Sequence, residues 1–342
     1  MIDFRYHLVS IVAVFLALAI GIVVGATALK PSTLKYLDKT SQQERQEINS
    51  LLANKGDLQQ QLTNNNAFAE ANAGLILNRL LEGKRAVIVT APGADGQVVS
   101  GVTTALDQAG AQVTGQVALQ QAFFAADQGT QSSLVALAQQ LVPPGISLIG
   151  QGSQSGANPQ IAGQQDAAQV IAAALVTKDG PGLNAASSRQ ILSGFAQHGF
   201  LDVSTPTLAP ATLAVVVIPS SPPAGGDSDP ANLALLALTE QLETNGQAAV
   251  LAGSPPGSGS GSAIDELSAG GSGMQLSSVD NANTEIGQIM VAQALNLLLT
   301  GHKPASYGVV PAAVPSPAPT PSPSASPSGS AAGQAAGGAR QR

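Results

Sequence analysis

Cysteine is absent from this 342-residue chain, which excludes disulfide bonds, thiolate metal sites and cysteine nucleophiles. Tryptophan is absent too, and aromatic residues make up only 3% of the sequence although hydrophobic residues make up 44%. Any folded core must therefore consist mainly of small aliphatic side chains. Cationic residues are also scarce, because 14 Lys and Arg stand against 21 Asp and Glu. Since a chain that binds nucleic acid normally carries a basic patch, we expect no nucleic-acid partner.

One long apolar run is present, residues 8–29, and it contains no charged residue until Lys30. Its 22 residues would extend roughly 33 Å as a helix, enough to cross a hydrocarbon core of about 30 Å. A cleavable signal peptide is the alternative, because Ala26-Thr27-Ala28 has the form of a cleavage site. The run is longer than such peptides use, so we expect an uncleaved transmembrane signal anchor over residues 1–30.

The basic residues on either side of this run bear on its orientation in the membrane. Arg5 precedes the run, whereas Lys30, Lys35, Lys39 and Arg45 follow it. Counting alone favours a cytoplasmic location for the long C-terminal side. A short tail before a first hydrophobic segment instead favours export, and long domains translocate largely regardless of charge. We therefore expect a single-pass protein of the cell membrane or cell envelope with its bulk outside the cytoplasm.

Small residues recur at every fourth position of the apolar run. They are Ala13, Ala17, Gly21 and Gly25, which lie close to one face of a helix. Small residues at this spacing let two helix backbones approach closely in lipid, as in G-x-x-x-G dimers. Two interpretations stay open here: a dimerisation face within the membrane, or a chance pattern in a helix rich in Ala and Gly.

A heptad-like pattern follows over residues 31–82. Pro31 is expected to end or kink the membrane helix, and Gly56 and the run 64–66 weaken the helix beyond it. One interpretation is a parallel coiled-coil stalk that makes the protein a homodimer or higher homo-oligomer. The other is a single amphipathic helix packed on its own domain. We expect the coiled coil, with a core formed by Leu34, Leu37, Ile48, Leu51, Leu58 and Leu62.

Aliphatic strands alternate with helices from residue 84 onwards, which predicts βαβ units. The expected strands span 85–90, 112–119, 213–218, 247–252 and 275–279. The first expected helix follows the turn at 91–96 and ends at about residue 109. The other expected helices span 120–142, 160–176, 187–197, 230–244, 262–269 and 284–299. This alternation favours an α/β fold, here a three-layer, mainly parallel-sheet, Rossmann-like domain over residues 84–310.

The C-terminal segment, residues 311–342, is rich in Pro, Ser, Ala and Gly. A segment of this composition cannot bury enough apolar surface to fold. We therefore expect a disordered tail.

No recognisable catalytic motif accompanies this fold. The chain has no G-x-S-x-G elbow and no phosphate-binding P-loop, and its Gly-rich turns at 92–96 and 253–261 lack a dinucleotide fingerprint. His7, His198 and His302 are interpreted as surface or capping residues. We therefore expect no enzyme activity, no catalytic residues and no cofactor, although an α/β hydrolase or ligand-binding enzyme remains a rival interpretation.

Metal-ligating residues are few and scattered. The three histidines and the three methionines, Met1, Met274 and Met290, are not paired at the spacing that copper ligands need. The acidic pair at 227 and 229 is interpreted as a solvated loop rather than a cation site. No metal-binding residue can be named from these patterns.

Two segments carry a resemblance to a known family. The opening, residues 1–25, resembles the start of the actinobacterial copper transporter family typified by mycobacterial copper transport protein B. Residues 278–284, with Gly287 and then Gly301 to Tyr307-Gly308, resemble the C-terminal signature of that family. The resemblance implies an envelope protein linked to copper homeostasis, as an outer-membrane channel or exporter. For related members it implies a coiled coil outside the cytoplasm that acts on the control of wall hydrolases.

Two functions follow from these observations. The first is a membrane-anchored cell-envelope protein of the copper transporter family that serves copper efflux or homeostasis. Copper enters this hypothesis through the resemblance alone. The alternative is a dimeric envelope scaffold that recruits or regulates a cell-wall hydrolase during cell separation, which requires a cell-envelope protein partner.

Overall fold

The computed structural model describes residues 4–149, 158–180, 182–204, 209–221, 228–255, 261–270 and 272–309. Within these ranges, the side chains of residues 4–5, 26–35, 37–38 and 228–229 are not described. The predicted tail, residues 311–342, lies outside the described residues. The chain divides into two compact units, Met1–Phe68 and Ala69–Arg342.

The first unit consists of most of one long helix, α1 (Phe4–Leu77). This helix is continuous through Pro31, so the proline does not end the membrane helix, whereas the expected alternative, a kink at the proline, stays a prediction. A proline removes only one backbone hydrogen bond from a helix interior. Long stretches of helix-forming residues on both sides maintain the helix despite this loss.

The second unit is built around a seven-stranded sheet with the strand order β3-β2-β1-β4-β5-β6-β7. All neighbouring strands pair in parallel except β2 and β3, which are antiparallel. The expectation of an α/β fold with a mainly parallel sheet is confirmed. The strands are β1 (Arg85–Thr90), β2 (Gln112–Leu119), β3 (Leu201–Val203), β4 (Leu213–Ile218), β5 (Ala248–Gly253), β6 (Ser277–Val279) and β7 (Ser306–Tyr307).

The central strands of this sheet are covered on both faces. All six residues of β4 and all six of β5 are buried. A strand buried on both faces needs a continuous aliphatic run rather than alternating polar residues, and Leu213–Ile218 supplies one. The core has few aromatic side chains because Ala, Val, Leu and Ile fill most of it.

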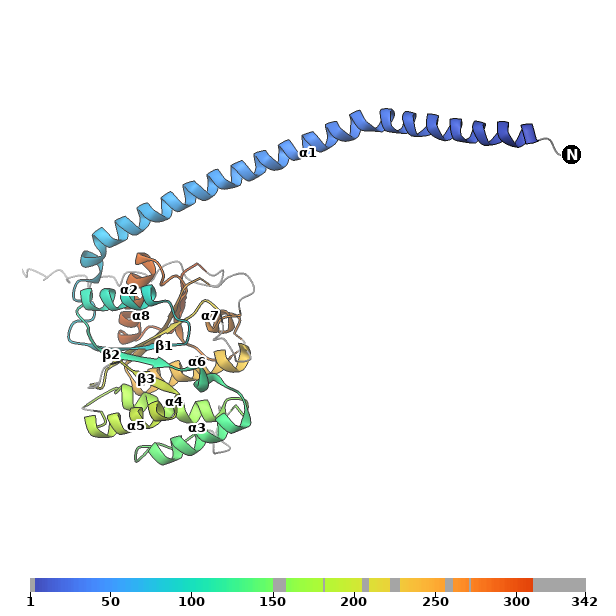
Figure 1. Cartoon of the computed structure of the whole chain (residues 1–342). Coiled ribbons are helices and arrows are strands. Elements are labelled where there is room, and N and C mark those ends of the chain that lie inside the picture. The colour runs from blue at the N-terminus through green and yellow to red at the C-terminus, as the bar shows by residue number, and fades with distance from the viewer. Residues whose placement is uncertain are drawn as a thin grey trace, which may run out of the picture. The chain divides into compact units, whose positions relative to one another are not determined.

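Helices pack on both faces of the sheet, as Figure 1 shows. On one face, α2 (Gly96–Gln108), α8 (Glu285–Leu299) and the C-terminal turns of α1 share a hydrophobic cluster with β1, β4 and β5. The remaining helices enclose a second cluster on the opposite face. They are η1 (Gln121–Phe124), α3 (Gln128–Leu141), α4 (Ala162–Leu175), α5 (Ala185–Gln197), α6 (Ser228–Asn245) and α7 (Ala263–Ser268).

Two local features differ from the sequence-based expectations. The single helix expected over 120–142 is two elements, η1 and α3, because Asp127 starts a new helix by accepting a hydrogen bond from the backbone N–H of Thr130. The strands β3 and β7 were not predicted. They have three and two residues, too few for a periodic signal to appear.

Candidate functional site

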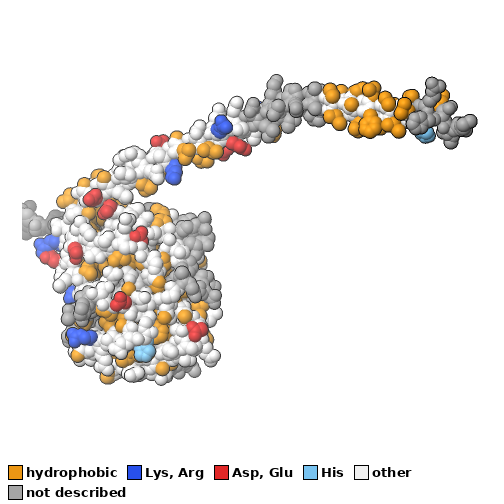
Figure 2. All heavy atoms as spheres, viewed as in Figure 1, with side chains coloured by type: hydrophobic (Ala, Val, Ile, Leu, Met, Phe, Trp, Pro, Cys, Tyr) orange, Lys and Arg blue, Asp and Glu red, His pale blue; other side chains and the backbone are white. Residues whose placement is uncertain are grey.

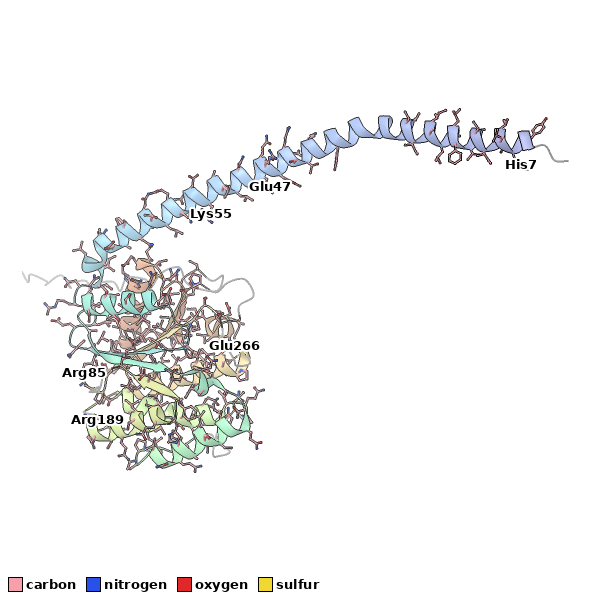
Figure 3. All side chains as sticks on the ribbon, in the orientation of Figure 1. His7, Glu47, Lys55, Arg85, Arg189 and Glu266 are labelled. Atoms are coloured by element: carbon pink, nitrogen blue, oxygen red, sulfur yellow. The ribbon has the colours of Figure 1, made fainter. Side chains whose placement is uncertain are left out.

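The first candidate site is the apolar part of α1. Residues Tyr6–Gly25 have a mean hydropathy of 2.9, and none of this stretch is buried. Figure 2 shows hydrophobic side chains covering this part of the helix, and Figure 3 places His7 near its N-terminal end. By length and composition it is the one helix of the described residues that can cross a membrane. A signal sequence has the same properties, so the helix is consistent with anchoring without proving it.

The small residues predicted to form a dimerisation face lie within this exposed stretch. The structure places Ala13, Ala17, Gly21 and Gly25 on successive turns of α1. Nothing lies within 4 Å of the position that a Cβ would take at Gly21 or Gly25. This face is therefore open to a second helix, and dimerisation through it stays a prediction.

The predicted coiled-coil core divides into described and undescribed side chains. Ile48, Leu51, Leu58 and Leu62 are 55%, 60%, 60% and 56% exposed, values that are high for aliphatic residues. The side chains of Leu34 and Leu37 lie outside the described residues. In this article the four described residues are called the α1 stripe.

Near the C-terminal end of α1, the apolar side chains are buried instead of exposed. Ala69, Ala73 and Leu77 are buried in the core of the second unit, with 4%, 4% and 0% exposure. The last turns of the helix thus belong to the α/β domain, whereas the α1 stripe is solvent-exposed. Figure 3 shows Glu47 and Lys55 on this part of the helix. Lys55 is seven residues from both Ile48 and Leu62, so this charged residue lies on the same face as the stripe.

A second candidate site is the C-terminal signature that carried the family resemblance. Its residues form the link between β6 and α8. Thr284 is the N-cap of α8, because its hydroxyl oxygen accepts a hydrogen bond of 3.1 Å from the backbone N–H of Gly287. The same hydroxyl donates a 2.8 Å hydrogen bond to the carbonyl oxygen of Asn281. A Cβ at Gly287 would overlap that carbonyl group, so only glycine fits there.

The signature also fixes the strand β7. Asp280 is 1% exposed, and its Oδ1 accepts a 2.7 Å hydrogen bond from the backbone N–H of Val309. Its own backbone N–H donates a 3.1 Å hydrogen bond to the carbonyl oxygen of Tyr307. Gly308 has a φ of +132°, and a Cβ there would overlap the Asp280 carboxylate. These residues form a structural clasp, a role that sequence reasoning missed because Asp280 and Val309 are 29 positions apart.

The two histidines of the α/β domain, His198 and His302, make local contacts at two different helix ends. His198 is the C-cap of α5, as predicted, with Nδ1 at 2.9 Å from the Gly194 carbonyl oxygen and its ring stacked on Phe200. His302 lies beyond the end of α8, where Nδ1 is 3.0 Å from the Thr300 hydroxyl. Both rings therefore serve local contacts at helix ends.

Other candidate metal ligands are equally dispersed. Met290 is buried in one hydrophobic cluster, whereas Met274 packs against the other. The described residues contain no group of three or more His, Cys, Asp or Glu that could hold a metal ion. Met1, the acidic pair at 227 and 229, and most of the turn at 253–261 lie outside the residues whose side chains are described.

Two glutamates on α6 are electrostatically coupled. Partial burial raises the pKa of Glu243 above its ordinary value, and the nearby charge of Glu240 raises it further, although Lys178 acts in the opposite direction. Burial also raises the pKa of Glu240. The raised pKa values make the stability of the domain depend on pH.

Comparison with known proteins agrees with the resemblance found in the sequence. The sequence model of the family described as "Copper transport outer membrane protein, MctB" matches residues 1–317. A protein of Mycobacterium tuberculosis named "Copper transporter MctB" is 26% identical over 316 residues, which cover 90% of this chain and 96% of the relative. A protein of the same name from Mycobacterium leprae is 28% identical over 319 residues, with the same coverage.

Proposed function

Because the chain belongs to the MctB family of copper transport outer membrane proteins, we propose that it is a membrane-anchored envelope protein that supports copper efflux or homeostasis. The observation that carries this proposal is the match of the family over residues 1–317, which includes the apolar helix and the α/β domain together. The relatives in Mycobacterium are named copper transporters, and the whole length of those proteins is nearly covered.

The anchor in this proposal is α1 from Tyr6 to Gly25. A helix in lipid satisfies its own backbone groups, and side chains that are fully exposed in the isolated chain become solvated by hydrocarbon. We place the C-terminal bulk outside the cytoplasm, since a short N-terminal tail before a first hydrophobic segment favours that orientation.

The copper function in this proposal depends on the assembly rather than on a preformed cage within one chain. His198 and His302 lie at two different helix ends, and Met274 and Met290 belong to two different hydrophobic clusters. A single membrane helix forms no pore by itself. We therefore propose that copies of the chain associate, so that any path for copper is formed between chains or with a partner protein.

The α1 stripe supports association in a homodimer. Four aliphatic residues that are more than half exposed would become buried against the same residues of a second copy. Two copies anchored in one membrane are held parallel and at high effective concentration, which favours a short coiled coil. The same observation favours the alternative function, a dimeric scaffold whose stalk engages a cell-envelope partner such as a wall hydrolase.

The proposed function is tested in a strain that lacks this chain. We expect greater copper sensitivity in that strain, restored by the full chain. A matched variant carries a cleavable signal peptide in place of residues 1–30, so that the domain is exported without an anchor. Failure of this variant to restore tolerance, together with resistance of the full chain to carbonate extraction, supports the anchored role.

Unchanged copper sensitivity in the deletion strain would contradict the copper role. If that strain instead fails to separate its cells, the scaffold function gains support, and Leu51→Pro or Leu58→Pro should reproduce the defect by breaking the stalk. A topology reporter fused after residue 310 tests the orientation independently of both functions.

A further inference from the structure

An open cleft lies on the α/β domain beside α2. It has a volume of about 800 Å³ and is lined by residues from the C-terminal ends of β1 and β2, from the turn after β1 and from one side of α2. In open α/β sheets, ligands bind outside the carboxyl ends of the strands, next to the point where the strand order reverses. Here the chain passes from β1 through α2 to β2 on one side, while β4 lies on the other side of β1. The residues that line the cleft come from β1, β2 and α2 and none comes from β4, so the cleft lies at the carboxyl ends of the strands on the β2 side of β1.

The end of β1 contributes a polar side chain, Thr90, to the lining of this cleft. Thr90 is only 7% exposed, and it follows four buried residues, Ala86–Val89, in the same strand. Its hydroxyl has no hydrogen-bond partner among the described residues. The hydroxyl oxygen is not among the fully buried polar atoms that lack a partner, so it is accessible from the open cleft and keeps its capacity to donate and accept hydrogen bonds. A ligand in the cleft would supply that partner.

The floor of the cleft is formed by β2. Gln116 and Ala118 line it, and β2 is paired on both sides, with β1 and with β3. The backbone groups of this strand are thus used by the sheet, which leaves recognition to side chains. The amide of Gln116 has no side-chain hydrogen bond among the described residues, so both its donors and its acceptor are available.

The wall formed by α2 presents acceptors. The hydroxyls of Ser100, Thr103 and Thr104 each donate their proton to a carbonyl oxygen of their own helix, at 3.0, 2.7 and 3.0 Å. Their oxygens retain lone pairs that face the cleft, so they can accept hydrogen bonds but not donate them. No Lys, Arg, Asp or Glu lines this cleft, so its lining favours a neutral ligand over a charged one.

We propose that this cleft binds a neutral saccharide, with Thr90 and Gln116 as the principal recognition residues. Sugar hydroxyls both donate and accept, so they can donate to the α2 hydroxyl oxygens and accept from Gln116 and Thr90. The small residues Ala91, Gly93 and Ala118 leave room for a sugar ring. No aromatic side chain lines the cleft to stack on the ring, so we expect weak affinity, in the range of about 0.1–1 mM.

This inference is tested with the full chain in detergent micelles, titrated with tri-N-acetylchitotriose and followed by saturation-transfer NMR and calorimetry. We expect saturable binding. Thr90→Val removes only the hydroxyl and Gln116→Leu only the amide, and each should weaken binding about five- to tenfold. Thr63→Val makes the same chemical change on an exposed residue of α1 that does not line the cleft, and it should leave binding unchanged.

A fourth variant separates a lost site from a lost fold. Ala118→Leu fills the cleft floor and should abolish binding without lowering the unfolding temperature, because this side chain is only partly buried. The proposal is overturned if the trisaccharide does not bind at 20 mM, or if it binds Ala118→Leu as well as the unmodified chain. Tighter binding of inorganic phosphate or of trialanine than of the trisaccharide also overturns it. None of these outcomes bears on copper tolerance.

Discussion

Asp280 and Val309 are joined by a hydrogen bond of 2.7 Å, from the backbone N–H of Val309 to Oδ1 of a carboxylate that is almost completely buried. This bond attaches the last described segment of the chain to the strand β6. It explains why the two parts of the signature, residues 278–284 and 307–308, contact each other. The first part supplies the carboxylate of Asp280. The second part contains Gly308, where the positive φ and the nearby carboxylate require glycine.

The clasp predicts a large cost for a methyl group at Gly308. Gly308→Ala should lower the free energy of unfolding by about 2–3 kcal/mol, since φ is positive there and the new Cβ would overlap the Asp280 carboxylate. Gly301→Ala is the matched control, because Gly301 also has a positive φ but open space around it, and we expect a cost of about 1 kcal/mol. Urea unfolding of both variants measures the difference. Equal costs would show that the overlap is relieved by movement of the β7 segment.

The N-cap of α3 predicts an acid-sensitive contribution to stability. Asp127→Ala should lower the unfolding temperature at neutral pH, since the carboxylate caps the helix by accepting hydrogen bonds from the backbone N–H and the hydroxyl of Thr130. The side-chain hydrogen bond from Thr130 holds the pKa of Asp127 below its ordinary value of 3.8. The stabilisation is therefore present above that value and is lost as the pH falls through the lower, folded-state pKa.

The control for this cap is Asp107, an exposed carboxylate in the last turn of α2. A negative charge at a helix C-terminus is unfavourable, so Asp107→Ala should leave stability unchanged or raise it slightly. Thermal unfolding of both variants between pH 2 and pH 7 tests the pair. If Asp127→Ala unfolds at the same temperature as the unmodified chain at pH 7, the N-cap of α3 makes no contribution to stability.

The glutamate pair on α6 predicts the opposite pH dependence. Burial and the charge of Glu240 raise the pKa of Glu243, so the folded state holds its proton more tightly than the unfolded state does. Stability is therefore lost as the pH rises from the ordinary value of 4.5 through the raised one. Glu243→Gln should raise the unfolding temperature at pH 7 and have little effect at pH 4.

The exposed Glu70 of α1 provides the comparison, and Glu70→Gln should change the unfolding temperature at neither pH. A Glu243→Gln variant that gains as much at pH 4 as at pH 7 would show that its stabilisation comes from packing rather than from the lost charge.

If the α1 stripe forms a dimer interface, cysteines introduced into it should form disulfide bonds between two copies. The chain has no cysteine of its own, so no other thiol can react. In the proposed parallel dimer, Leu58→Cys places two thiols at a core position, whereas Gln60→Cys places them on the outer face. We expect oxidation of membranes to convert most of the Leu58→Cys chain, and less than about a tenth of the Gln60→Cys chain, to a covalent dimer. Non-reducing gel electrophoresis reads the result. Similar cross-linking of both variants would indicate random collision in the membrane.

Much of the fold could be predicted from the sequence because its signals are local. The run Leu213–Ile218 is aliphatic at every position and is a strand buried on both faces. His198 follows a helical pattern and caps the helix end as predicted. The restart of the helix at Asp127 was missed, since a capping aspartate inside an otherwise helical pattern is a weak local signal.

The candidate sites could be predicted only in part. The heptad pattern does not predict that Leu58 and Leu62 are exposed, because a helix face that packs against its own domain shows the same spacing of apolar residues. Gln116 and Thr90 gave no sequence signal beyond a polar residue in an aliphatic strand, because the cleft exists only where β1, β2 and α2 meet.

By itself, the sequence determined the apolar segment of α1, the order of the longer strands and helices, and the absence of thiol chemistry, since each depends on composition or on short-range periodicity. Tertiary structure alone decided which residues meet. It brought Asp280 to Val309, buried Ala69 and Leu77 while leaving Leu58 exposed, and left the hydroxyl of Thr90 facing a cleft. The physical reason is that such contacts join segments distant in the chain, and their geometry follows from the packing of helices on the sheet.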